Sequence, residues 1–197
     1  MTKLLLPLSL IFLVSCASPY GVQPGLQLIS ESEYDQIINQ FSDKDRQYSG
    51  LYNLFDMRAT LLNTPVKLAQ VDHSARLFQW DKAKYDTERE KALSDLTKET
   101  QVFVSFFTPE KRHDDLHKSK TLWKIFLDID GRRYEGRATK MKQLTTEIRS
   151  FYPDHNSFST PYLISFPVGA KTLEGKNSTL VITGPVGSAT AEFRAIR

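Results

Sequence analysis

Hydrophobic residues recur at alternating three- and four-residue steps between residues 30 and 62. Spacing of this kind is typical of one face of an amphipathic helix. Ser30 and Glu33 have the spacing of a capping box at its start, and Asn63-Thr64-Pro65 predicts its end, because the residue before a proline is steered away from helical geometry. The pattern therefore predicts one helix of roughly 30 residues. The stripe consists of Tyr34, Ile38, Phe41, Tyr48, Tyr52, Phe55 and Leu62, widened by Ile37, Leu51, Leu54 and Leu61.

A second helical segment is expected from about Val66 to Lys98, with a break along its length. Its first half has apolar residues on one side, whereas its second half, from Asp81 onward, is highly charged. Together with the first stripe, this segment predicts a long αα-hairpin whose far part is mostly solvated.

After Thr100 the hydrophobic period changes from about 3.6 to 2, the period of a β-strand. Residues 102–107 are apolar on both faces of the expected strand. Two further strands, 122–129 and 132–139, flank Asp130-Gly131, a favoured type I′ hairpin turn. This turn would place Leu127 opposite Tyr134 and Asp128 opposite Arg133, and further along it would set large residues opposite small ones. The far pairs are Ile125 with Gly136 and Trp123 with Ala138.

Three more strands are expected at 162–168, 178–183 and 189–196, separated by Gly- and Pro-containing turns. The predicted fold class is therefore α+β: an N-terminal long αα-hairpin followed by an antiparallel, sandwich-like β domain of about six strands. The predicted boundaries are 30–99 for the helical hairpin region and 100–197 for the β domain.

The first residues have the pattern of an export signal. Lys3 precedes an apolar run, residues 4–14, that is too short to span a bilayer, which needs about 20 residues, but suits a signal peptide. Leu13-Val14-Ser15-Cys16 then resembles the lipobox of bacterial lipoproteins. The resemblance implies removal of residues 1–15, diacylation of Cys16 and, because Ala17 rather than Asp follows, sorting to the outer membrane. Residues 16–29 would form a lipidated tether.

Composition narrows the choice of partners. The formal net charge is +3 and no long basic run occurs, which argues against nucleic acid. Cys16 is the single cysteine, so an exported domain has no internal disulfide and depends on burial for its stability.

Few residues are candidates for metal binding or catalysis. His113 and His117 have i,i+4 spacing and would share a helix face, but the charged segment around them favours a solvated loop rather than a metal site. Asp154-His155 lies near Ser157, Ser159 and Thr160, yet a hydrolytic triad needs a base that a third group orients in space. We therefore expect no catalytic residue, no metal and no cofactor. In the same connection, Phe151, Tyr152 and Phe158 are candidates for an exposed contact patch, with capping of the β core as the alternative.

The sequence thus favours a lipid-anchored envelope protein that acts by binding, as a scaffold or a subunit of an envelope complex, rather than an enzyme. It would contact the membrane through lipid on Cys16 and bind a protein of the envelope. Two alternatives remain. One is a periplasmic binder of a small apolar ligand, with Gly136 and Ala138 leaving room inside the β domain. The other is an anchored hydrolase that uses His155 or His113.

Overall fold

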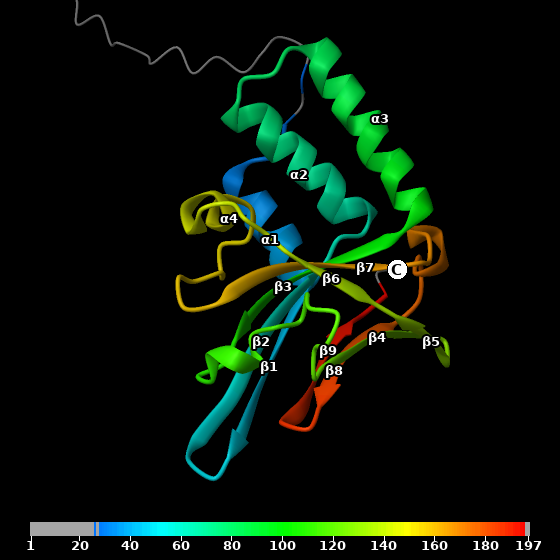
Figure 1. Ribbon diagram of the computed structural model, residues 1–197. Coiled ribbons are helices and arrows are strands. Elements are labelled where there is room, and N and C mark those ends of the chain that lie inside the picture. The colour runs from blue at the N-terminus through cyan, green and yellow to red at the C-terminus, as the bar shows by residue number, and fades with distance from the viewer. Residues whose placement is uncertain (1–25, 27, 196–197) are drawn as a thin grey trace, which may run out of the picture.

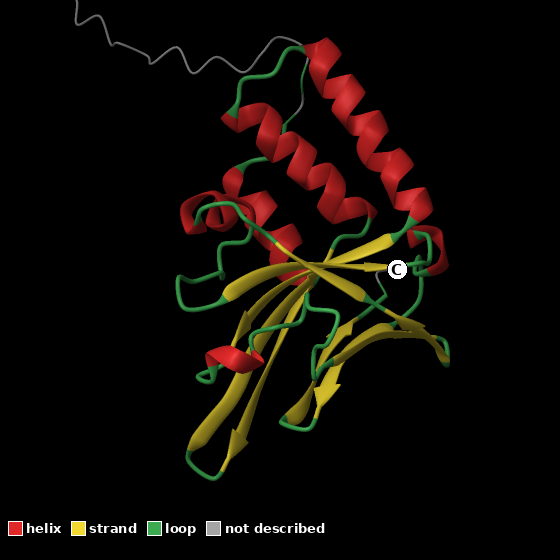
Figure 2. Cartoon of the chain, viewed as in Figure 1, coloured by secondary structure: helices red, strands yellow, loops and turns green. Residues whose placement is uncertain are grey.

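The computed structural model describes residues 26 and 28–195 of the 197-residue chain. The predicted signal peptide (1–15), Cys16, Ala17 and most of the predicted tether lie outside the described residues. In this part of the chain, nine strands form two β-sheets, and the helices form a layer on one side of them (Figures 1 and 2). The helices are α1 (Glu31–Gln40), α2 (Thr64–Leu77), α3 (Lys82–Lys98) and α4 (Thr145–Phe151), with short 3₁₀ turns at Lys111–His113 and Ala170–Thr172. The strands are β1 (Ser42–Ser49), β2 (Tyr52–Leu61), β3 (Thr100–Phe107), β4 (Lys124–Ile129), β5 (Arg132–Glu135), β6 (Arg137–Lys140), β7 (Thr160–Phe166), β8 (Ser178–Gly184) and β9 (Gly187–Phe193).

The expected N-terminal helical hairpin is wrong, and with it the predicted fold class. The capping box at Ser30 and Glu33 exists and begins α1, but this helix ends at Gln40 and the chain continues as the β1–β2 hairpin. Gly50, with φ +60°, lies in the turn between the two strands. In β2 alternate residues from Phe55 onward are buried, namely Phe55, Met57, Ala59 and Leu61, and Thr60 near the end of the strand is buried as well. The apolar residues between 30 and 62 therefore include a stretch with the two-residue period of a strand. Their three- and four-residue spacing had been interpreted as a helix.

The structure has nine strands in two antiparallel sheets in its described part, where the sequence predicted a sandwich-like domain of about six strands. The five-stranded sheet has the order β1-β2-β3-β7-β6 and the four-stranded sheet the order β5-β4-β8-β9. Strand β3 is central and buried on both faces, as its sequence predicts. The three late strands also lie close to their predicted positions. β7 and β9 each begin two residues earlier than expected and end two or three residues earlier, whereas β8 begins at the expected residue and ends one residue later.

The chain passes from one sheet to the other at Gly136. The predicted register around Asp130-Gly131 is confirmed for Leu127 with Tyr134 and Asp128 with Arg133. The strand then turns away after a last hydrogen bond from Gly136 N–H to Ile125 O at 2.9 Å. Ala138 consequently pairs with Ile164 of β7, not with Trp123 as expected. A Cβ atom on residue 136 would lie 2.5 Å from Cε1 of Phe166, so only glycine fits at this crossing.

Side chains join the opposite edges of the two sheets. Asp45 accepts a hydrogen bond from Thr190 N–H at 3.0 Å, and Asp43 accepts one from Glu192 N–H at 2.7 Å. Strand β1 thereby lies against β9 and covers edge groups that would otherwise face solvent. The two sheets enclose one core, which includes Phe55, Val104, Phe106, Trp123, Leu127, Tyr162, Ile164, Phe166, Leu180 and Ile182.

A second core lies between the helices and the outer face of the five-stranded sheet. Tyr34 and Ile38 of α1 pack here with Phe103 of β3, and the Tyr152 ring stacks on Phe103 with ring centroids 3.6 Å apart. The helical segment expected at 66–98 is present as α2 and α3, with its break at residues 78–81. Only Leu96 of α3 is buried, so the predicted solvated half is confirmed. Within residues 26 and 28–195, no helix is both long and apolar enough to cross a membrane.

Candidate binding surface

The tip of the β1–β2 hairpin is the most exposed apolar feature of the described chain. Leu51 is fully exposed, and Tyr52 and Tyr48 are 80% and 55% exposed. Residues 47–53, which we call the hairpin tip, contain no charged side chain. Figure 1 shows this hairpin extending away from the body, on the side opposite α2 and α3. Tyrosine and leucine side chains presented in this way are unusual for a surface that contacts only water.

The tip extends beyond the sheet because its neighbours end early. Strand β2 pairs with β3 only from Asp56 to Leu61, so residues 47–55 form a two-stranded ribbon past the end of β3. An ion pair between Arg46 and Asp56 (3.4 Å) crosses this ribbon at its base. At the same level Asn53 Nδ2 donates to Asp56 Oδ1 at 2.9 Å. The base of the hairpin tip is therefore fixed, while its apolar side chains face outward.

A groove of about 380 Å³ lies on the outer face of the same hairpin. Arg58 lines this groove and is held by an ion pair with Asp154 and a hydrogen bond to Asn39 Oδ1 at 3.1 Å. Phe158, 74% exposed, lies on its rim. The remaining lining residues are Lys44, Arg46, Asp56, Met57, Ser105, Phe107, Asn156 and Ser159. The groove therefore combines cationic, anionic and aromatic groups beside the hairpin tip.

Below this groove, His155 forms a hydrogen bond with a serine that the sequence did not indicate. Its Nδ1 lies 2.8 Å from Oγ of Ser105 on β3, and both side chains are buried. Burial, aided by the nearby Arg149, lowers the pKa of His155, which keeps the imidazole neutral. The adjacent carboxylate of Asp154 is paired with Arg58 instead. Among the described hydrogen bonds no acid contacts this imidazole, and the Ser105–His155 pair joins the α4–β7 connection to β3.

The three aromatic residues predicted as a contact patch do not share one surface. Tyr152 is buried, and its hydroxyl accepts a hydrogen bond from Gln70 at 3.0 Å. Burial raises the pKa of Tyr152 to about 12. Phe151 is half-buried, with its ring edge against His73. Only Phe158 is well exposed, so it alone of the three lies where a partner could contact it.

The segment around His113 and His117 is an anchored loop. Asp114 accepts hydrogen bonds from the hydroxyls of Thr160 and Tyr162, the latter at 2.8 Å. Leu116 inserts into the inner core, and Trp123 donates from Nε1 to His113 O at 2.7 Å. The expectation of a solvated loop is therefore wrong for its centre. No group of three His, Cys, Asp or Glu side chains suited to a metal ion occurs in the part of the chain that the structure describes.

Comparison with known protein families, with curated proteins and with solved structures gives no significant match. Sequence reasoning missed the hairpin tip because it assigned Tyr48, Leu51 and Tyr52 to the apolar stripe of a helix. The signal that could have revealed the turn is Ser49-Gly50, a turn-forming dipeptide inside that stripe.

Proposed function

We propose that the protein is a lipid-anchored bacterial envelope protein that binds another envelope protein through its hairpin tip, and that it acts by binding rather than by catalysis. The observation that carries this proposal is the exposure of Tyr48, Leu51 and Tyr52 on a projecting, uncharged ribbon. Tyrosine is enriched where protein partners meet, because its large rigid ring loses little conformational entropy on binding. The lipobox-like Leu13-Val14-Ser15-Cys16 supplies the anchor, and Ala17 directs the protein to the outer membrane.

A projecting ribbon suits this role physically. A short two-stranded ribbon alone is only marginally stable in water, but here its base is tied to β3 by pairing and to β9 by the Asp43 and Asp45 side chains. The tip is thereby preorganised, which reduces the entropy lost when it enters a partner's pocket. The groove and Phe158 lie beside the tip and extend the same surface with polar contacts. The expected partner surface is an apolar pocket with a polar rim.

The alternative function, binding of a small apolar ligand, was based on expected room beside Gly136 and Ala138 inside the β domain. Gly136 does face the core, but ring atoms of Phe166 and the Cγ2 atom of Ile164 occupy the adjoining space, within 3 Å of where a Cβ would lie. The hydrolase alternative needs an acid that orients His155 through its second ring nitrogen, and none does so among the described hydrogen bonds; Ser105 and His155 are also both buried. Neither alternative therefore has support comparable to that of the exposed hairpin tip.

The test is affinity purification of the tagged, full-length protein from solubilised native membranes. A Leu51→Ser, Tyr52→Ser double variant removes the apolar side chains of the tip. The matched control is Leu144→Ser, which removes another exposed leucine (67%) from the start of α4, where serine is a favoured N-cap residue.

The proposal predicts a partner that co-purifies with the wild type and the control and is lost at least tenfold with the double variant. Equal capture by all three proteins, or capture of no partner by any of them, would overturn it. A Cys16→Ala variant tests the anchor separately. It should leave the membrane fraction, and its retention there would contradict lipidation of Cys16.

A further inference from the structure

The connection between α2 and α3 forms a second exposed apolar surface. We call residues 77–80, Leu-Phe-Gln-Trp, the α2–α3 turn. Phe78 is 64% and Leu77 47% exposed, whereas Trp80 is half-buried. The rings of Phe78 and Trp80 stack with centroids 6.4 Å apart, and Lys84 Nζ lies 4.9 Å from the centroid of the Trp80 ring. An uncharged, aromatic turn with a lysine beside it has the chemistry of residues at a membrane–water interface.

Hydrogen bonds on both sides of the α2–α3 turn hold it in place. Trp80 N–H donates to Ala75 O at 3.0 Å, and the Asp81 side chain caps α3 by accepting from Lys84 N–H at 2.8 Å. Farther along the two helices, the Tyr85 hydroxyl donates to Asp72 Oδ1 at 2.7 Å. The turn thus presents its apolar side chains from a fixed helical hairpin, with the backbone groups at its ends satisfied.

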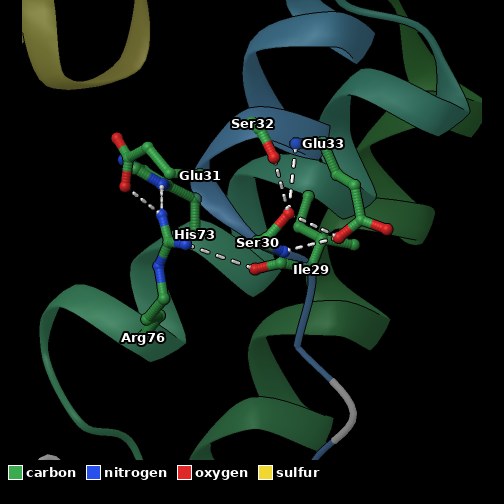
Figure 3. A network of polar contacts seen from close by, with 7 residues as sticks. All are labelled: Ile29, Ser30, Glu31, Ser32, Glu33, His73 and Arg76. Carbon is green, nitrogen blue, oxygen red and sulfur yellow. Dashed lines mark hydrogen bonds and ion pairs between the residues drawn. The ribbon is translucent and has the colours of Figure 1, made fainter.

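The beginning of the described chain is fastened next to this turn. Arg76, one residue before it, forms an ion pair with Glu31 and donates from Nη1 to Ile29 O at 3.4 Å. Arg76 Nη2 also lies 2.9 Å from Nδ1 of His73. Figure 3 shows this network, in which the arginine of α2 reaches the chain just ahead of α1. Residues 29–31 are therefore held at the end of α2 that leads into the α2–α3 turn.

The described chain begins ten positions after Cys16, the predicted lipid attachment point. Leu26 is ten positions after Cys16, so a fully extended chain between the two residues would span at most about 35 Å. The α2–α3 turn lies at one end of the molecule and the hairpin tip at the other (Figure 1). An anchor at Cys16 joins the described chain at the end that carries the turn, which favours an orientation with the turn toward the membrane and the tip away from it.

We propose that the α2–α3 turn rests on the lipid surface to which Cys16 is anchored, with Phe78 and Trp80 at the boundary between headgroups and acyl chains, so that the hairpin tip points away from that membrane. This inference rests on the proposed lipid anchor. Because the anchor confines the turn near the surface, a weak apolar contact is sufficient to orient the protein. The orientation explains why one molecule has two separate exposed apolar surfaces: one faces lipid and the other faces the protein partner.

The test uses the lipidated, full-length protein purified in detergent and reconstituted into vesicles of phosphatidylethanolamine and phosphatidylglycerol. Half of these lipids carry bromine on their acyl chains, which quenches tryptophan on contact. The protein has two tryptophans, and Trp123 lies in the inner core at 2% exposure, so it serves as an unquenched internal reference. Trp80→Phe removes the reporter, and Leu144→Ser is again the exposed-leucine control.

The proposal predicts that brominated vesicles remove the Trp80 part of the emission in the wild type and the Leu144→Ser control. The emission of Trp80→Phe should stay unchanged. Protein that floats with the vesicles while Trp80 stays unquenched would overturn the lipid contact and leave the anchor standing. Protein that carries no lipid on Cys16 and does not float would overturn both the anchor and this inference. A Phe78→Ser variant should float as the wild type does but lose at least half of the quenching.

Discussion

A methyl group added at Gly136 tests the crossing of the chain between the two sheets. In Gly136→Ala the new Cβ would lie 2.5 and 2.8 Å from two ring atoms of Phe166 and 2.9 Å from Cγ2 of Ile164. Both neighbours are fully buried, so neither can move without disturbing the inner core. Overpacking of this kind costs about 1–3 kcal/mol. For a domain of this size each kcal/mol lowers Tm by about 2–4 °C, so we expect a decrease of about 2–12 °C.

Urea denaturation followed by tryptophan fluorescence measures this cost, because Trp123 lies in the same core. The control is Arg137→Ala, which changes the next residue on the strand but removes an exposed side chain. It should alter the free energy of unfolding by no more than about 0.5 kcal/mol. If Gly136→Ala is as stable as the wild type, the strand does not pass against Phe166, and the account of the crossing is refuted.

Two further predictions concern stability. Asp43→Ala removes the acceptor for Glu192 N–H and should lower the free energy of unfolding by about 1 kcal/mol in urea denaturation. The control Asp86→Ala breaks only an exposed pair with Lys82 and should lower it by less than about 0.5 kcal/mol. Equal losses would contradict closure of the sheets at β1 and β9. Burial lowers the pKa of His73 and of His155, so below pH of about 6.5 the unfolded chain binds protons that the folded chain does not, and the free energy of unfolding should fall from pH 7.5 to 5.5. A His73→Gln, His155→Gln variant should show a flatter dependence over this range, and an unchanged slope would show that these histidines are not held neutral.

Local signals in the sequence predicted those parts of the fold that depend on local chemistry. The capping box at Ser30, the Asp130-Gly131 turn and the charged face of α3 each follow from neighbouring residues, and each is present. The β1–β2 hairpin was missed because aromatic residues at steps of three and four outweighed the alternation from Phe55 to Leu61. A strand at that position is favoured by its pairing with β3, whose residues lie more than 40 positions away along the chain.

The candidate site was harder to predict than the fold, since its residues meet only through long-range packing. The partner of His155 is Ser105, fifty residues earlier and on another element. Tyr152 and Phe158 are six residues apart, yet one is buried on Phe103 and the other is exposed. Exposure of this kind depends on which side of a loop meets the body of the protein. No local pattern encodes that choice.

The most direct test of the central claim is photo-crosslinking in living cells from a reactive amino acid placed at position 51, with position 144 as the exposed control. The account predicts a discrete protein adduct from position 51 that is absent from position 144 and is lost when Cys16→Ala releases the protein from the membrane. Adducts with lipid at position 51, no adduct there, or the same protein adducts from both positions would contradict the claim that the hairpin tip is the partner-binding surface of an anchored protein.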